Sequence, residues 1–187
     1  AHANLIEAYD KFIASGCADP HFIQEICSTD SNKSAQRLGE MLLYERLNHA
    51  LPSINISSQS NGPDFRIEID GKPAWLELVT PSIGDDIRIT ELQEAYNPLF
   101  PCPDAATELR ERHLLRVTSA IASKLEAYEK YIAKEIVPPD QPLIIVINDS
   151  LLCGDLFGYG VYTGPIAGVS GSSLASEAVH GLGHSIW

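Results

Sequence analysis

The hydrophobic pattern of the first fifty residues predicts helices. Apolar residues recur every three to four positions over residues 4–14, which is typical of an amphipathic helix. A short second helix is predicted over residues 22–26. A longer helix is predicted over residues 34–51, because this segment holds good helix formers and Pro52 stops it.

The next segment has the pattern of a β-hairpin. Over residues 64–79, Phe65, Ile67 and Ile69 alternate with polar residues, and Asp70-Gly71 is a strong signal for a two-residue turn. A short strand over residues 54–57 could precede the hairpin.

The second half of the chain predicts a loop, a helix and a strand. Residues 81–103 are rich in proline and acidic residues, and we expect an irregular lid or binding loop there. Residues 105–136 contain no proline or glycine and predict one long helix. Residues 143–147 predict a buried strand. Residues 154–171 hold six glycines, and beyond them residues 172–180 could form a helix.

The order helix, hairpin, helix, strand predicts a mixed α/β fold. A chain of 187 residues with 44% apolar composition can bury one sizeable core. We expect an N-terminal helical extension (1–33), a core (34–150) and a Gly/Ser-rich C-terminal segment (151–187) that could pack on the core. The longest apolar run, residues 143–147, is too short to cross a bilayer, so no membrane association is expected.

The cysteines carry no metal or disulfide pattern. The four residues are scattered without a C-x-x-C pair: Cys17, Cys27, Cys102 and Cys153. This spacing predicts neither a zinc knuckle nor a dense disulfide framework. Reduced thiols in a cytoplasmic protein are expected instead.

The net charge of −12 argues against a broad nucleic-acid footprint. Affinity for nucleic acid comes largely from neutralised phosphates, which usually requires a basic surface. Three explanations stay open: a nucleic-acid contact is small and centred on a metal, a basic partner does the holding, or the ligand is something else.

The hairpin register brings two carboxylates together. With a two-residue turn at Asp70-Gly71, Asp64 lies opposite Glu77, and opposed Cβ atoms are about 4.5–5.5 Å apart. Like charges at that distance need neutralisation, and hard oxygen ligands suit Mg²⁺ or Mn²⁺. The alternative is that Glu77 pairs with Arg66 or Lys72 at a sheet edge.

Glu40 is a third candidate carboxylate. Positions three, seven and eleven residues after it are Leu43, Leu47 and Leu51, so Glu40 lies on an apolar helix face. A glutamate on a buried face is rare unless it is paired or bound. The alternative to a metal ligand is that Arg37, one turn earlier, satisfies Glu40.

The long helix supplies cations. At 100° per residue, an arc of roughly 80° beside the apolar stripe contains His113, Arg116, Ala120 and Lys124. Arg116 and Lys124 could therefore reach over a sheet edge from the rim of the core. The alternative is that Lys124 is a lysine that snorkels at the border of an amphipathic helix.

Four elements in order resemble the PD-(D/E)xK nuclease superfamily over about residues 35–148. They are Gly62-Pro63-Asp64, residues 75–79 (Trp-Leu-Glu-Leu-Val), residues 38–43 (Leu-Gly-Glu-Met-Leu-Leu), and residues 116–121 with Lys124. The resemblance implies a restriction-endonuclease-like αβββαβ core, in which helices flank a mixed central sheet.

The resemblance also implies the site. Asp64, Glu77 and the carbonyl of Leu78 would bind Mg²⁺ or Mn²⁺, and Glu40 would complete the shell. The lysine of the motif belongs at position 79, which here is valine. Some superfamily members carry that lysine on the neighbouring helix, where Lys124 is the candidate and Arg116 could assist it.

Three functions follow as hypotheses. The first is a metal-dependent nuclease that acts on DNA, with RNA as the less favoured substrate. The second is a PD-(D/E)xK-like module that has lost catalysis and serves binding or assembly. The third is an interaction domain of a larger protein. A protein partner or a homodimer is compatible with each of them.

Overall fold

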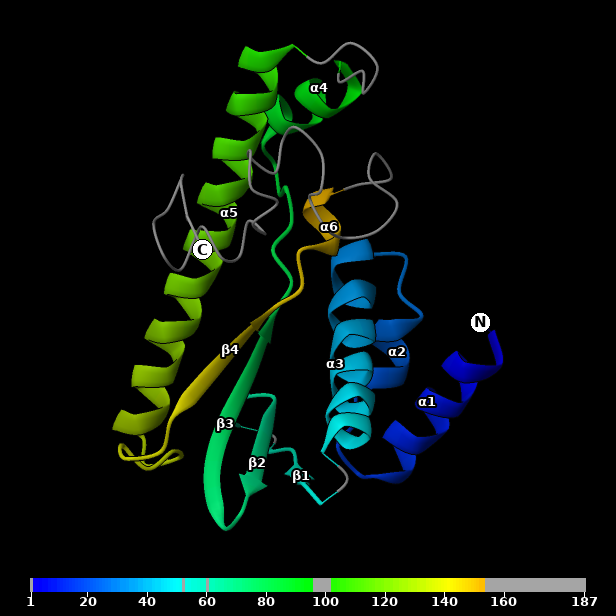
Figure 1. Cartoon of the computed structure of the whole chain (residues 1–187), viewed down its shortest axis with the longest axis vertical. Helices are drawn as coiled ribbons and strands as arrows, with labels where there is room; N and C mark the ends of the chain where they lie inside the picture. The colour runs from blue at the N-terminus through cyan, green and yellow to red at the C-terminus, as the bar shows by residue number, and fades with distance from the viewer. Residues whose placement is uncertain (1, 52, 60, 96–101, 154–187) are drawn as a thin grey trace. The chain divides into compact units, whose positions relative to one another are not determined.

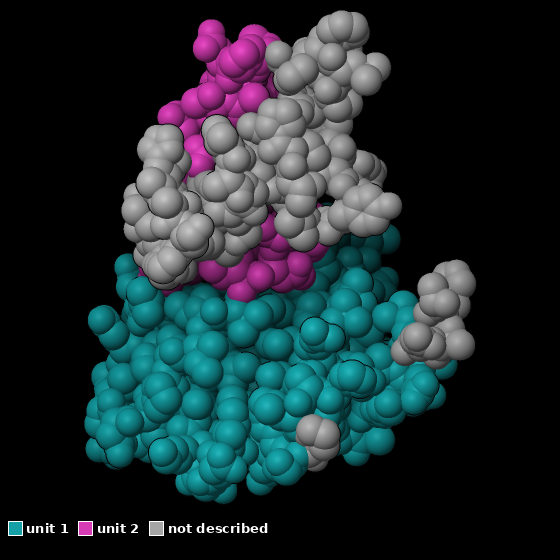
Figure 2. Space-filling view, viewed as in Figure 1, with its two compact units in different colours: residues 1–79, 123–146 teal, residues 80–122, 147–187 magenta. Residues whose placement is uncertain are grey.

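The computed structural model describes residues 2–51, 53–59, 61–95 and 102–153, and the structural statements below concern this part of the chain. The chain forms two compact units, shown in different colours in Figure 2. Unit 1 consists of residues 1–79 and 123–146. Unit 2 contains residues 80–122 and the chain from residue 147 onward. The glycine-rich segment and the helix predicted over residues 172–180 lie outside the described residues.

Unit 1 begins with three helices, as the hydrophobic pattern predicts. They are α1 (His2–Ala14), α2 (Phe22–Ile26) and α3 (Ser31–Ala50). Helix α3 begins three residues before its predicted start at residue 34, because Asp30 is its N-cap and accepts a hydrogen bond from the amide of Asn32 at 3.0 Å.

A four-stranded mixed sheet follows, with the strand order β1-β2-β3-β4. The strands are β1 (Asn55–Ser57), β2 (Phe65–Ile69), β3 (Lys72–Val79) and β4 (Leu143–Ile147). Strands β1, β2 and β3 pair antiparallel, whereas β4 runs beside β3 in the same direction (Figure 1). The chain is therefore a mixed α/β protein, in agreement with the coarse fold prediction.

The hairpin has the predicted register. Phe65 pairs with Leu76 and Ile69 pairs with Lys72. Asp70 and Gly71, with φ of 52° and 73°, both adopt the left-handed conformation that a type I′ turn requires. The two-residue turn is therefore confirmed, and with it the geometry that places Asp64 near Glu77.

The core of unit 1 lies between the first three helices and one face of the sheet. Phe65 and Leu76 share that face and pack with Phe12, Phe22 and Met41. From Trp75 to Val79, every residue of strand β3 is buried, so both faces of the strand are covered there. A carboxylate in this stretch is consequently removed from water.

Unit 2 holds a smaller core. Helix α4 (Ile87–Ala95) packs on the first turns of α5 (Pro103–Ala133) through the buried residues Ile89, Leu92, Ala106 and Leu109. A short α6 (Ser150–Cys153) belongs to the same unit. His113 is fully buried, and this burial lowers its pKa to about 4.

Three sequence expectations need correction. Residues 81–103 are not irregular throughout, because Asp86 caps α4 by accepting from the amides of Arg88 and Ile89 at 3.1 and 3.4 Å. Helix α5 ends at Ala133 rather than at residue 136, since Glu135 has a left-handed φ of 58°. Strand β4 is half-buried rather than buried, because it lies at an edge of the sheet and leaves Ile144 45% exposed.

Within the described residues, no helix combines the length and the apolar character that a membrane crossing requires.

Candidate functional site

The end of the hairpin fixes two carboxylates by backbone hydrogen bonds. The amide of Asp64 donates to Oε2 of Glu77 at 3.2 Å. The amide of Leu78 donates to Oδ2 of Asp64 at 2.7 Å. Each side chain is thus held by backbone from the opposite side of the hairpin, just beyond the last regular pair, Phe65 and Leu76. The structure therefore brings Asp64 and Glu77 together, as the register predicts.

Lys124 completes this pair from helix α5. Its Nζ lies 2.5 Å from Oε1 of Glu77, and only 7% of the Glu77 side chain is exposed. Burial alone would lower the pKa of Lys124, but the hydrogen bond and the charge of Glu77 outweigh burial and raise it. Of the two alternative partners proposed for Glu77, Arg66 instead lies 3.7 Å from Glu68, and Lys72 is opposite Ile69 beside the turn. Glu77 is therefore neutralised from the helix and not along the sheet edge.

A hydrogen-bonded clamp explains why Lys124 reaches Glu77. The hydroxyl of Tyr128 donates to the carbonyl of Gln141, and the indole of Trp75 donates to Oε1 of the same glutamine, both at 2.7 Å. Tyr128 lies one turn after Lys124 on α5, and Trp75 lies two residues before Glu77 on the same strand face. Gln141 thus holds α5 and β3 together next to the ion pair, and this limits the positions that the Lys124 ammonium can occupy.

Glu40 is buried, as its place on an apolar helix face predicts, but it is also satisfied. It is 5% exposed, and both carboxylate oxygens accept from Nη1 of Arg37, at 3.1 and 2.8 Å. Arg37 also pairs with Asp19 at 2.7 Å and with Glu25 at 2.6 Å. The structure thus shows the alternative interpretation of Glu40, a carboxylate neutralised by Arg37. The sequence pattern missed Asp19 and Glu25, because both lie outside the helix that carries Arg37.

The three carboxylates are close enough to influence one another. Burial, followed by the charges of Glu77 and Glu40, raises the pKa of Asp64 to about 7. Burial also raises the pKa of Glu40, although its hydrogen bonds with Arg37 act in the opposite direction. Glu40 and Asp64 line one cavity of about 180 Å³, together with Arg37 and Gly62. This corner of unit 1 therefore holds more negative charge than its buried cations neutralise.

The donor set fits a cation that uses few protein ligands. Among the described residues, no group of three or more Asp, Glu, His or Cys side chains is arranged to hold a metal. Asp64 and Glu77 are nevertheless adjacent hard oxygen donors. Mg²⁺ usually binds through one or two carboxylates and completes its shell with water and substrate phosphate. Asp64 and Glu77 are the residues that could hold Mg²⁺ or Mn²⁺ in that manner, without Glu40 as an obligatory ligand.

Arg116, the second predicted cation, belongs to unit 2. Its Nε donates to the carbonyl of Ser82 at 2.8 Å, and its guanidinium lies close to Gly84. Gly84 has a left-handed φ of 56°, a conformation that favours glycine. The cluster in unit 1 is built from Glu40, Asp64, Glu77 and Lys124, without Arg116.

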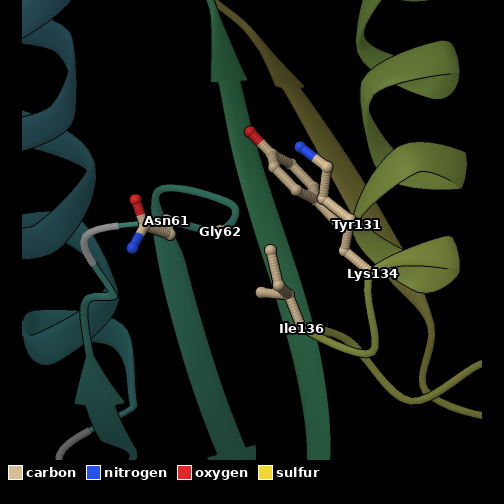
Figure 3. Close-up of a pocket in the computed structure, with 5 residues that line it drawn as sticks. All are labelled: Asn61, Gly62, Tyr131, Lys134 and Ile136. Carbon is tan, nitrogen blue, oxygen red and sulfur yellow. The ribbon is translucent and has the colours of Figure 1, made fainter.

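A second pocket in unit 1 borders this cluster. Its volume is about 580 Å³, and its lining residues, shown in Figure 3, are Asn61, Gly62, Tyr131, Lys134 and Ile136. Neither Tyr131 nor Lys134 is among the site residues predicted from the sequence. The signal was present, because Tyr131 follows Lys124 by seven residues and so lies on the same face of α5.

Comparison of the chain with family models, with curated proteins and with solved structures gives no match. The function is therefore argued from the residues of the site.

Proposed function

We propose that this protein is a metal-dependent nuclease of the PD-(D/E)xK type that hydrolyses phosphodiester bonds in DNA or RNA. Lys124 on α5 takes the place of the lysine that the motif puts at position 79, where this chain has valine. The observation that carries the proposal is the 2.5 Å contact between Nζ of Lys124 and Glu77. It puts a cation beside the acidic pair although the strand itself does not supply one.

The order of elements supports the proposal. Helix α3, strands β1 to β3, helix α5 and strand β4 follow one another in the αβββαβ order of a restriction-endonuclease-like core. Helix α4 is an addition between β3 and α5. The mixed sheet, with β3 between β2 and β4, places Asp64 and Glu77 at one end of its central hairpin.

The chain's own residues divide the work of a hydrolysis. Asp64, Glu77 and the carbonyl of Leu78 would hold the cation. Glu40 could join them only if its hydrogen bonds with Arg37 were broken and replaced by a bond to the cation. When bound, Mg²⁺ or Mn²⁺ lowers the pKa of a water molecule and polarises the phosphate. The Lys124 ammonium has three N–H donors, and its contact with Glu77 uses one of them. The others can donate to a phosphate oxygen as negative charge develops there.

A cleavage assay on the full chain tests the role of Lys124. Labelled DNA and RNA, single- and double-stranded, are incubated with Mg²⁺ or Mn²⁺. Loss of one preorganised charge stabiliser typically costs about 100- to 1,000-fold in rate, so Lys124→Ala should lose most cleavage while Mn²⁺ still binds. The control is Lys130→Ala, which removes an exposed lysine from the same helix and should cleave at the wild-type rate.

A second variant tests the position of the charge. Val79 lies two residues after Glu77 on the same strand face, so a lysine there would point toward the same corner. Val79→Lys added to Lys124→Ala should restore part of the activity. Undiminished cleavage by Lys124→Ala would show that the migrated-lysine mechanism is wrong.

A non-catalytic module for binding or assembly is the second candidate function. Two observations favour it: valine at position 79, and Arg37 bound to both oxygens of Glu40. Titration calorimetry with Mn²⁺ separates the two functions. If Mn²⁺ neither binds nor raises the melting temperature, and the wild type cleaves no nucleic acid, the non-catalytic function replaces the nuclease.

A further inference from the structure

The pocket beside the acidic pair combines an aromatic ring, a cation and an amide. Tyr131 comes from the last turn of α5, Lys134 directly follows that helix, and Asn61 lies across from them in the segment before β2 (Figure 3). Tyr131 is half-buried, whereas Lys134 and Asn61 are exposed. Among the described residues, no ion pair or side-chain hydrogen bond occupies the Lys134 ammonium, which is therefore available to an anion.

Two links connect this pocket to the proposed catalytic residues. Gly62 lines both this pocket and the smaller cavity of Glu40 and Asp64, and it lies two residues before Asp64. Tyr131 lies two turns beyond Lys124 on the same helix face. Burial and the charge of Glu77 raise the pKa of Tyr131.

The chemistry of the lining suits one nucleotide. An aromatic face stacks a base without regard to its identity, a lysine binds one phosphate as a point charge, and an amide can pair with a base edge. A volume of about 580 Å³ is within the range of small-ligand pockets.

These features favour an unpaired nucleotide over one in a duplex. A base inside a duplex must leave its stack before it can enter a pocket, and this costs a few kcal/mol that an unpaired base does not pay. A duplex also depends on many phosphate contacts, whereas this chain has a net charge of −12. In a subsite with one aromatic ring and one lysine, stacking of the base on the ring supplies affinity that few phosphate contacts cannot supply.

We propose that the pocket of Asn61, Gly62, Tyr131 and Lys134 binds the unpaired nucleotide next to the phosphate that is cut, so that the substrate is single-stranded nucleic acid or an unpaired end. This inference rests on the nuclease function proposed above, and it adds the substrate class. Tyr131 and Lys134 are substrate-binding residues for that nucleotide.

Fluorescence anisotropy with the full chain tests the subsite. The probes are a labelled oligothymidylate of eight nucleotides and a labelled duplex of equal length, both in EDTA so that binding is measured without cleavage. The single strand should bind more tightly than the duplex. Tyr131→Leu should weaken its binding about 5- to 150-fold, whereas Tyr131→Phe, which keeps the ring, should bind as the wild type does.

A matched pair of lysine variants tests the phosphate contact. Lys134→Gln should reduce the slope of log affinity against log salt concentration by about 0.7, the value for one phosphate of a single strand. Lys130→Gln removes the same charge one turn earlier on α5, outside the pocket, and should leave the slope unchanged. Equal effects of the two variants, or tighter binding of the duplex, would overturn the subsite.

Failure of the subsite and failure of the nuclease give different results. Mn²⁺-dependent cleavage that requires Lys124, but is indifferent to Tyr131→Leu and Lys134→Gln in both KM and kcat, retains the nuclease and overturns the subsite. Single-strand binding that depends on Tyr131 and Lys134, in a protein that neither binds Mn²⁺ nor cleaves, supports the subsite in a binding module and overturns the nuclease.

Discussion

Asp64 and Glu77 share the end of the β2–β3 hairpin, and Lys124 is the cation that contacts the pair among the described residues. One ammonium neutralises one of two carboxylates. The other carboxylate, Asp64, has no cation in contact with it among the described residues, and its burial raises its pKa to about 7. Without a metal the fold therefore favours a protonated Asp64. At neutral pH and above, ionised Asp64 lowers the free energy of unfolding, whereas an uncharged asparagine at this position would not.

This cost predicts a stabilising substitution. The pKa of Asp64 rises from 3.8 in the unfolded chain to about 7 in the fold, so its contribution to stability is complete below pH 3.8 and is lost as the pH rises through 7. Asp64→Asn keeps an oxygen that accepts from the Leu78 amide but carries no charge. In EDTA, urea unfolding should show the variant more stable than the wild type at pH 8, with a smaller difference at pH 5.

Metal binding is expected to act in the opposite direction. Mn²⁺ should stabilise the wild type and leave Asp64→Asn nearly unchanged, because a ligand that binds only the folded state stabilises it by an amount that grows with the logarithm of the ligand concentration divided by its dissociation constant. The control is Asp70→Asn, an exposed turn residue at which an asparagine adopts the left-handed φ of 52° readily. If both variants shift stability equally at both pH values, the cluster does not perturb Asp64 in the way described.

Among the elements, α3 and the N-terminal helical extension share a network of ion pairs centred on Arg37. Arg37 on α3 pairs with Asp19 before α2, with Glu25 in α2 and with Glu40 on its own helix. The Arg37 side chain is 19% exposed and that of Glu40 is 6% exposed, so this network is largely removed from water. The extension therefore controls the position of Arg37, and through it the charge available at Glu40.

Removal of this arginine should be costly in a specific way. Arg37→Met leaves Glu40 buried without its partner, and loss of one partner of a buried pair costs roughly 3 kcal/mol or more. Urea unfolding should show this loss, and the double variant Arg37→Met with Glu40→Gln should recover part of it, because no buried charge is then left unpaired. Lys11→Met, which breaks more exposed pairs with Glu7 and Glu45, should change stability little. Additive effects of Arg37→Met and Glu40→Gln would contradict the coupling.

The elements show how far sequence reasoning carries and where it ends. The hairpin could be predicted to the residue, because Asp70-Gly71 sets the register by local geometry alone. Helical periodicity placed Lys124 at the rim of the core. The expectation that it reaches over a sheet edge was wrong, because its partner Glu77 lies on the interior strand β3. That contact is supported by the hydrogen bonds of Gln141, which join segments 66 residues apart in the chain. Local patterns carry no signal for such contacts.

The same limit explains what was missed in the site. The pairing of Glu40 with Arg37 is local, at three residues, and the sequence offered it as one alternative. Asp19 and Glu25 reach Arg37 only through the packing of α2 on α3, and composition gives no indication of it. Helix α4 was missed because its cap, Asp86, lies in a stretch rich in the residues that usually mark loops.

For the whole molecule, the net charge of −12 limits how it can hold nucleic acid. Affinity for a duplex would have to come from very few phosphate contacts, and the lysines of the proposed site and its subsite are Lys124 and Lys134. Release of counterions gives a slope of about −0.9 per phosphate for B-form DNA. A protein with one or two such contacts should therefore bind duplex weakly, and the logarithm of its affinity should fall only about one to two units for each tenfold increase in salt.

Fluorescence anisotropy of a labelled duplex of about 20 base pairs measures this slope. The salt concentration is varied from roughly 25 to 200 mM, a range over which counterion release changes the affinity measurably. Lys134→Gln should change this duplex slope less than the single-strand slope, because the subsite takes an unpaired nucleotide, and Lys130→Gln should not alter it. A steep slope would contradict the expectation, since it requires many neutralised phosphates and hence a basic face that neither the composition nor the described residues of unit 1 supply. A shallow slope together with Mn²⁺-dependent cleavage of single strands would instead mean that the negative charge of the protein selects against duplex by repulsion. An unpaired strand end would still reach Tyr131, Lys134 and the carboxylate pair.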